Sequence, residues 1–490
     1  MSTEPTTSDK TPSFGIFRNW FSLAGVVLTI ASLFCFILLF LLDTFSHSSN
    51  PYIGLLTYVV SPAFLFMGSG MVVVGVLWRR RQARKMGEAT PKFQIDLGRP
   101  KDRRILGVFL GGSAVFLLIS ALLSYQTYHY SESVQFCGQA CHNVMKPEYV
   151  LYSHGPHARV ACVECHVGPG AEWFVKAKIS GTHQLYSVIV NKYPKPVPTP
   201  VKNLRPAQET CERCHWPKKF VGNLDKTYNY FLADETNTPF TVRLLMKVGG
   251  SDPTHGPVGG IHWHMSVGNK VEYLATDPAR QKIPWVRITD SQGVVTEYKT
   301  KNFTNAVDIA SVRTVDCMDC HNRPAHAYQS PNDAVNLALS VGGIDRGMPW
   351  IKSNAVFALT KKYTNETQAL QGIATHLANW YPKDARVHQA IAAVQEIYTN
   401  NFFAEMNASW DKYPNNIGHK DWLGCFRCHD GQHKSSDGRL IKANDCNACH
   451  TILAQGIGEQ LNLLTPLGQK FKHPGDEVDG ACNDCHTGGL

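Results

Sequence analysis

The chain has 490 residues, a formal net charge of +9 and 15 cysteines. Its length allows more than one domain, and no low-complexity tract marks a disordered one. The positive charge does not predict nucleic-acid binding, because much of it lies in a single segment between two apolar runs, where it can face anionic lipid. The basic residues of that segment are Arg79, Arg80, Arg81, Arg84, Lys85, Lys92, Arg99, Lys101, Arg103 and Arg104.

Three apolar runs lie in the first 125 residues, at about 20–42, 53–78 and 105–125. Each is long enough to cross a bilayer, which takes about 20 residues in a helix. A cleaved signal peptide would explain the first run alone, and that run is longer than a signal-peptide core. A buried core helix is the alternative for each run, but their length and lack of charge argue against it. We therefore expect three transmembrane helices.

Basic residues orient these helices. Lys10 and Arg18 precede the first run, residues 43–52 carry neither Lys nor Arg, and the basic segment 79–104 follows the second run. Positive charge favours the cytoplasmic side. We expect the tail 1–16 and the loop 79–104 in the cytoplasm, and the chain from residue 129 onward on the periplasmic side of a bacterial inner membrane.

Seven cysteine–histidine motifs follow the third run. Six have the spacing C-x-x-C-H, and the first has one extra residue between its cysteines. Two thiols at this spacing form thioethers to a porphyrin and the adjacent histidine binds its iron, so the motifs predict seven covalently bound haem c groups. A zinc site is the alternative for one motif, but seven in one chain argue strongly against it. The motif residues are Cys137, Cys141 and His142; Cys162, Cys165 and His166; Cys211, Cys214 and His215; Cys317, Cys320 and His321; Cys425, Cys428 and His429; Cys446, Cys449 and His450; and Cys482, Cys485 and His486.

A low-spin haem needs a second axial ligand, and 13 further histidines lie beyond the third run. We expect distal ligands among those near a motif or paired in a strand-like run, as His262 and His264 are around Trp263. The other histidines, including His376 and His388, are weaker candidates. Met145, three residues after His142, could ligate the first haem or pack against its porphyrin. The distal candidates are His157, His262, His264, His326, His419, His433, His154, His473 and Met145.

Four motifs precede residue 322 and three follow residue 424. Between them, Ser330-Pro331-Asn332-Asp333 predicts a helix start and Gly342-Gly343 its end, and 366–378 and 387–398 have helical periodicity. Residues 241–248, 271–275, 285–289 and 294–298 predict strands of a small β insert. The expected fold is a membrane protein with three N-terminal transmembrane helices and a mainly α or irregular multihaem domain with this insert. Its expected parts are a tail 1–16, a membrane domain 17–128, a tetrahaem domain 129–329 with the insert at about 240–300, a helical insert 330–410 and a trihaem segment 411–490.

The region from the third run onward resembles the NapC/NirT family of membrane-anchored, quinol-oxidising cytochromes. The resemblance covers about 105–326 and is carried by Phe136-Cys137-Gly-Gln-Ala-Cys141-His142-Asn-Val-Met145 and by Cys162-Val-Glu-Cys165-His166-Val-Gly-Pro-Gly170. The whole chain is similar to larger inner-membrane heptahaem cytochromes of the ImcH type, which are implicated in passing quinol electrons towards extracellular acceptors. The chain departs from the NapC/NirT pattern in its lengthened first motif, its two additional N-terminal runs and its three C-terminal motifs.

This resemblance implies a quinol pocket near the first haem. Family members have a Lys after the second motif that borders the pocket, and Lys176 and Lys178 occupy the matching stretch. Pairing with lipid phosphate or haem propionate is the alternative for both. Glu148 and Glu172 are candidate proton acceptors, with solvated carboxylates as the alternative.

The resemblance implies quinol:cytochrome oxidoreductase activity. Electrons would pass from menaquinol or another quinol through seven haems to soluble periplasmic c-type cytochromes, in anaerobic or extracellular respiration. A terminal reductase of an oxyanion such as nitrite is an alternative, but it needs an open iron site, and no C-x-x-C-K motif is present. A second alternative is a haem-bearing anchor for a separate reductase, although an anchor alone would not need three C-terminal haems. No nucleic-acid partner is expected.

Overall fold

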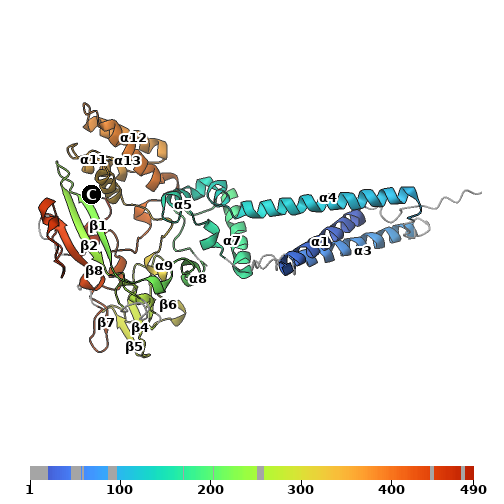
Figure 1. The fold of residues 1–490 in the computed structure, drawn as a ribbon, viewed down its shortest axis with the longest axis horizontal. Coiled ribbons are helices and arrows are strands. Elements are labelled where there is room, and N and C mark those ends of the chain that lie inside the picture. Colours follow the sequence, from blue (N-terminus) through green and yellow to red (C-terminus); the bar gives the residue numbers. More distant parts are fainter. Residues whose placement is uncertain are drawn as a thin grey trace, which may run out of the picture. The chain divides into compact units, whose positions relative to one another are not determined.

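The computed structural model describes residues 20–45, 57, 60–85, 97–168, 170–201, 204–250, 259–266, 268–441, 446–475 and 480–489. The tail 1–16, His47, His255 and most of the basic loop lie outside these residues. The chain forms two compact units (Figure 1). The first unit contains residues 1–136 and 167–182, and the second contains residues 137–166 and 183–490.

Three long helices dominate the first unit: α1 (Trp20–Phe45), α3 (Ser61–Lys85) and α4 (Pro100–Ser131). Each contains a stretch long and apolar enough to span a membrane, namely Phe21–Leu41, Ser61–Gln82 and Leu106–Ser131. The prediction of three spanning helices is confirmed. The second helix begins at Ser61, and most of the apolar run before it lies outside the described residues. The basic residues 79–85 continue α3, and those at 101–104 belong to the first turns of α4.

Glycines bring α1 and α3 close together. A Cβ atom added to Gly25 would lie 2.8 Å from the backbone nitrogen of Val72, and one added to Gly68 would lie 2.7 Å from the backbone nitrogen of Thr29. Small residues at such crossings let helix backbones approach within van der Waals distance, which is the main source of helix association in lipid. The first unit also contains the beginning of α7 (Ala171–Ile189).

Two antiparallel sheets lie in the second unit. One has the strand order β1-β2-β8 and the other β6-β3-β4-β5-β7. The four predicted strands are present as β2, β3, β4 and β5, but they are divided between the two sheets instead of forming one insert. The third strand of the first sheet, β8, begins at the motif residue His450 and comes from the C-terminal segment. The strands are β1 (Leu224–Phe231), β2 (Pro239–Met246), β3 (Lys270–Leu274), β4 (Trp285–Thr289), β5 (Val295–Lys299), β6 (Arg313–Thr314), β7 (Lys434–Ser435) and β8 (His450–Gly456).

Four helices form the insert between the two groups of motifs: α10 (Pro331–Ser340), α11 (Ile351–Thr360), α12 (Glu366–Trp380) and α13 (Val387–Asn401). Ser330 caps α10 as predicted, since its hydroxyl accepts a hydrogen bond from the backbone nitrogen of Asp333 at 3.2 Å. The sequence did not predict α11. Most residues of α11 are buried, including the polar Lys352 and Asn354. Its sequence therefore does not show the alternation of apolar and polar faces that predicts an amphipathic helix. The insert has its own apolar core, which includes Ile373, Leu377 and Val394.

Most motifs lie on a single helical turn. In such a turn the two cysteines of C-x-x-C are three residues apart and therefore point to the same side, where both thiols can reach one porphyrin. These turns are α6 (Cys162–His166), α9 (Cys317–Cys320), α14 (Cys446–Cys449), α15 (Cys482–Cys485), the 3-10 helix Gly424–Arg427 and the turn that follows α8 (Ala207–Cys211). The first motif leads into α5 (His142–His154).

The packing of the helical insert gives a first prediction. Leu377→Ala should lower the free energy of unfolding by about 2–5 kcal/mol, because Leu377 is fully buried and the truncation leaves a cavity. Leu337→Ala, on the exposed side of α10, should change it by less than about 1 kcal/mol. Denaturation followed by far-UV circular dichroism measures both, and equal losses in the two variants would contradict the assigned core.

Candidate functional site

Five motif histidines each face a second histidine. Two imidazoles that bind one metal ion from opposite sides, each with a metal–nitrogen distance of about 2.0 Å, hold their ring centres about 6 Å apart. The measured separations between ring centres match this value, so the residues fit a bis-histidine haem. The pairs are His157–His215 at 6.0 Å, His166–His326 at 6.3 Å, His264–His429 at 5.9 Å, His419–His450 at 6.2 Å and His473–His486 at 6.0 Å.

The motif residue His321 lies within electrostatic reach of both His262 and the motif residue His215. The Nδ1 atom of His262 is 3.1 Å from the carbonyl oxygen of Val248. A carbonyl can only accept, so Nδ1 carries the proton and the lone pair of Nε2 remains for a metal. The same arrangement holds for His157, His264 and His326, whose Nδ1 atoms lie 2.8–3.0 Å from backbone carbonyls. Such bonds orient a metal-ligating histidine.

His262 and His264 do not lie on a strand, in contrast to the prediction. Residues Ile261–Met265 form a 3-10 helix, which begins after Gly260 at a φ of 70°. Residues two apart in a 3-10 helix do not share a face. The two histidines therefore serve different motifs, with His262 beside His321 and His264 beside His429.

His433 and His154 are not brought to a motif histidine. His433 is fully buried, with its Nδ1 atom 2.8 Å from Asp430 and its Nε2 atom 2.7 Å from the carbonyl oxygen of Ile283. Both ring nitrogens are thus engaged in hydrogen bonds within the fold. The Nδ1 atom of His154 bonds to the carbonyl oxygen of Val150 in its own helix, at 3.0 Å.

The lengthened first motif folds as a π-helix, Phe136–Ala140, which absorbs the extra residue. Gly138 is required there, because a Cβ atom would lie 2.2 Å from the ring of Tyr149. His142 and Met145 stand three residues apart on the first turn of α5. Side chains at this spacing lie on the same helix face, so they cannot take opposite sides of one iron. Met145 is therefore an alternative to His142 and not its distal partner, and among the described residues no second histidine ring faces His142.

The first four motifs follow one another in space. The side chains of Cys137 and Cys162 lie close enough to interact, which places the first motif beside the second. Glu164 and Arg213 form an ion pair at 2.8 Å between the second and the third. The side chains of Cys211 and Cys317 lie close enough to interact, which places the third motif beside the fourth.

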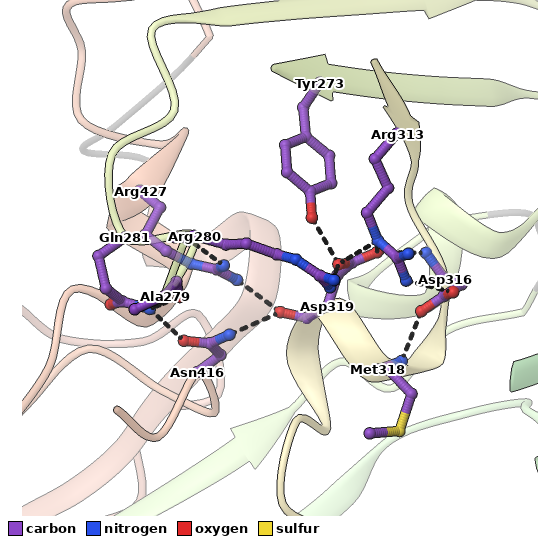
Figure 2. A network of polar contacts seen from close by, with 10 residues as sticks. All are labelled: Tyr273, Ala279, Arg280, Gln281, Arg313, Asp316, Met318, Asp319, Asn416 and Arg427. Carbon is purple, nitrogen blue, oxygen red and sulfur yellow. Dashed lines mark hydrogen bonds and ion pairs between the residues drawn. The ribbon is translucent and has the colours of Figure 1, made fainter. Parts of the chain in front are cut away.

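Arg427 joins the fourth and fifth motifs, although the helical insert separates them in sequence. Its guanidinium donates to the carbonyl oxygen of Asp319 at 2.6 Å and to that of Arg280 at 3.0 Å (Figure 2). Its Nε atom donates to the carbonyl oxygen of Gly424, in the turn of its own motif, at 2.9 Å. Arg427 is buried, so it ties these two turns together inside the fold.

The carboxylate of Asp319 is the centre of this network (Figure 2). It accepts from the hydroxyl of Tyr273 at 2.6 Å, from Arg280 at 3.2 Å and from the Nε atom of Arg313 at 3.0 Å. Only 4% of Asp319 is exposed, so the charge is compensated almost entirely by these groups. Burial, and then the neighbouring Asp319 charge, raises the pKa of Tyr273 and also that of Asp316.

The fifth, sixth and seventh motifs are joined through the segment 419–421. The ring of Phe426, in the fifth motif, stacks on His419 with ring centres 4.3 Å apart, and His419 faces His450 of the sixth motif. The next two residues, Lys420 and Asp421, lie within electrostatic reach of His486 in the seventh. All seven motifs therefore form a single succession in chain order.

Lys178 lies beside the C-terminal end of α4. Its ammonium group is 3.3 Å from the hydroxyl of Ser131 and 3.8 Å from a carboxylate oxygen of Glu132. That oxygen is buried and has no hydrogen bond in the described part of the chain. The sequence interpretation missed both Ser131 and Glu132, because they precede the first motif and belong to no motif. Lys176 instead lies over the ring of Trp173, 4.8 Å from its centre.

Glu148 is held away from free solvent. Its carboxylate accepts from Arg323 at 3.1 Å and lies 3.2 Å from the Nδ1 atom of His326, the residue that faces His166. A carboxylate in this position orients a metal-ligating histidine. Glu172 lies in the first turn of α7, and its side chain is outside the described residues.

Comparison with known proteins agrees with these motifs. Residues 99–200 match the model of the NapC/NirT cytochrome c family, N-terminal region. Over 494 aligned residues, the chain is 40% identical to the cytochrome c-type protein ImcH of Geobacter sulfurreducens, with 96% of each chain covered. The chain belongs to the ImcH family of c-type cytochromes. It is a membrane-anchored c-type cytochrome with covalently bound haem c. No solved structure matches it.

The Asp319 network gives a second prediction. Asp319→Asn should destabilise the protein by roughly 3 kcal/mol, because it leaves the charge of Arg280 partly buried without its carboxylate and leaves Arg313 with Asp316 alone. Asp437→Asn, which breaks an exposed pair with Arg439, is the matched control and should have no measurable effect. Thermal unfolding measures both, and a stable Asp319→Asn variant would show that the network is not needed to hold the two turns.

The histidine pairs give a third prediction. His264→Gln should convert one haem to the high-spin form, because His429 would lose the ligand opposite it. His433→Gln should leave the spin state of every haem as in the parent, because both nitrogens of His433 bond within the fold. Electron paramagnetic resonance distinguishes the two outcomes. A parental spectrum for His264→Gln, or a new high-spin signal for His433→Gln, would reverse the assignment.

Proposed function

We propose that this member of the ImcH family is a quinol dehydrogenase and electron conduit. It takes electrons from quinol at the outer face of the inner membrane and passes them through seven c-type haems to a soluble periplasmic cytochrome. The observation that carries this proposal is the unbroken succession of motifs, which starts at Cys137, six residues after the end of α4 at Ser131. A c-type haem, when bound, supplies reversible one-electron transfer.

The histidine pairs favour electron relay over substrate reduction. Two imidazoles on opposite sides of an iron leave no position for nitrite or a similar oxyanion. Five motif histidines have a second histidine ring 5.9–6.3 Å away, centre to centre, and none of the five belongs to the first motif. His142 of the first motif is exposed, and Cys137 follows the end of α4 by six residues of sequence, which suits contact with a lipid-soluble donor.

Quinol oxidation releases two electrons and two protons, so the site needs a proton acceptor near the quinol hydroxyl. In our proposal, Glu132 is this acceptor, because one of its carboxylate oxygens is buried and makes no hydrogen bond in the described chain. Lys178, which pairs with Glu132 and Ser131, holds the hydroxyl and stabilises the negative charge left by each proton transfer. Glu148 supports His326 instead, since its carboxylate is already occupied by Arg323 and His326.

The orientation of the membrane helices is part of the proposal. The basic residues at the end of α3 and the start of α4 favour the cytoplasm. The opposite end of α4, with Tyr125, Tyr128 and Tyr130, then lies at the periplasmic surface, where aromatic side chains are enriched.

The Lys178 and Glu132 pair gives a fourth prediction. Glu132→Gln and Lys178→Met should each slow the reduction of the haems by a menaquinol analogue about 100-fold, the usual contribution of a positioned proton-transfer group. Reduction by dithionite, which needs no proton acceptor, should be unchanged. Lys176→Met is the matched control and should retain the parental rate, because Lys176 lies over Trp173. Stopped-flow absorbance measures the rate of haem reduction in all three variants. An equal loss of rate in Lys178→Met and Lys176→Met would contradict the specific role of Lys178 at the quinol.

A further inference from the structure

Five large apolar side chains are exposed on the segment that follows β8. They form what we call the C-terminal apolar patch: Ile457, Leu463, Leu464, Leu467 and Phe471. Leu467 is 90% exposed and Leu463 75% exposed, although both are leucines. Single exposed apolar residues are ordinary, but a concentration of them over 15 residues is typical of an interaction surface.

The segment that carries the patch is held in place by β8. The backbone nitrogen of Thr465 donates to the carbonyl oxygen of Leu453 at 2.8 Å, and that of Gln469 to the carbonyl oxygen of Ile452 at 3.2 Å. Further on, the buried side chain of Gln455 donates to the carbonyl oxygen of Lys470 at 2.6 Å and accepts from the backbone nitrogen of Lys472 at 3.0 Å. The apolar side chains are therefore presented by a fixed backbone, which lowers the entropy cost of binding.

The patch lies next to the seventh motif. The ring of Phe471 is 6.3 Å from that of His473, centre to centre, and His473 faces His486 at 6.0 Å. His486 belongs to the last motif of the succession that starts at Cys137. A partner that binds here would thus be close to the end of the relay.

Two exposed lysines lie beside the patch, and Asp476, Glu477 and Asp479, which follow in sequence, lie outside the described residues. Lys470 and Lys472 flank Phe471 and are exposed, and Glu459 is the one acidic residue of the described stretch 457–475. A surface of this kind fits a partner that combines an apolar rim with negative groups. The exposed edge of a c-type haem has both properties, because its two propionates lie at the border of an apolar macrocycle.

We propose that the C-terminal apolar patch is the docking surface for the soluble c-type cytochrome that accepts electrons from this protein, and that the partner binds with its exposed haem edge. This inference rests on the proposed function as an electron conduit. Leu463 and Leu467 supply the apolar contact, and Lys470 and Lys472 attract the propionates.

Stopped-flow absorbance of the full-length protein in detergent tests this docking surface in two separate steps. The first step is reduction of the haems by a menaquinol analogue, without any partner. The second is reoxidation of dithionite-reduced protein by a soluble monohaem c-type cytochrome of net negative charge. The variants are Leu463→Ser/Leu467→Ser and Lys470→Glu/Lys472→Glu, and the matched control is Val341→Ser, a 72% exposed valine on the helical insert.

Both double variants should slow reoxidation about tenfold and leave reduction by quinol unchanged. The charge variant should also lose most of the salt dependence of the second step. The docking proposal is overturned if both double variants are reoxidised at the parental rate, or if sedimentation shows that the leucine variant dissociates a dimer of this chain. If quinol fails to reduce the parent but the second step still depends on the patch, the proposed function fails and the docking surface stands.

Discussion

Each haem motif supplies its iron with one ligand on one side, and the fold must bring a second ligand to the other side. Two imidazoles on one iron have their ring centres about 6 Å apart, and the five measured pairs lie between 5.9 and 6.3 Å. This requirement explains much of the connectivity of the second unit. His326, which follows the fourth motif, faces the second, and His157, which precedes the second, faces the third. A histidine near one motif therefore faces the histidine of another motif, and these pairs hold the motif turns together.

Hydrogen bonds and ion pairs also hold the motif turns together, in addition to the histidine pairs. Asp319 and Arg427 lie inside the fourth and fifth motifs. Each stands between the two cysteines, at a position where the C-x-x-C-H motif allows any residue. Their bond, at 2.6 Å, brings together two turns that the helical insert separates along the chain. The haem-free insert can then pack as an independent apolar core without interrupting the relay. A buried network of this kind adds specificity of arrangement, because every member must be satisfied at once.

The two ends of the succession differ in chemistry, which fits different partners. At the C-terminal end of α4, a lysine and a carboxylate lie together, as the proposed transfer of protons from a lipid-soluble donor requires. At the seventh motif, exposed leucines and lysines lie beside a histidine pair, as contact with a second haem protein requires. Under the proposed function, haems held between paired histidines would have no open coordination position, which favours electron relay over substrate binding.

Patterns among neighbouring residues were enough to predict much of this structure. Motif spacing identified the haem attachment residues, apolar length identified α1, α3 and α4, and capping residues identified the start of α10, because each of these depends on neighbours in sequence. The sequence alone could not order the motifs in space, nor predict that β8 joins a sheet with β2. His433 and His473 both stand near a motif in the sequence. Only the structure shows that His433 forms hydrogen bonds with Asp430 and Ile283, whereas His473 faces the motif histidine His486. The sequence alone also missed Glu132 and α11, whose roles depend on what packs against them. Ligand pairs, ion pairs and burial join residues tens to hundreds of positions apart, so only the tertiary structure decided them.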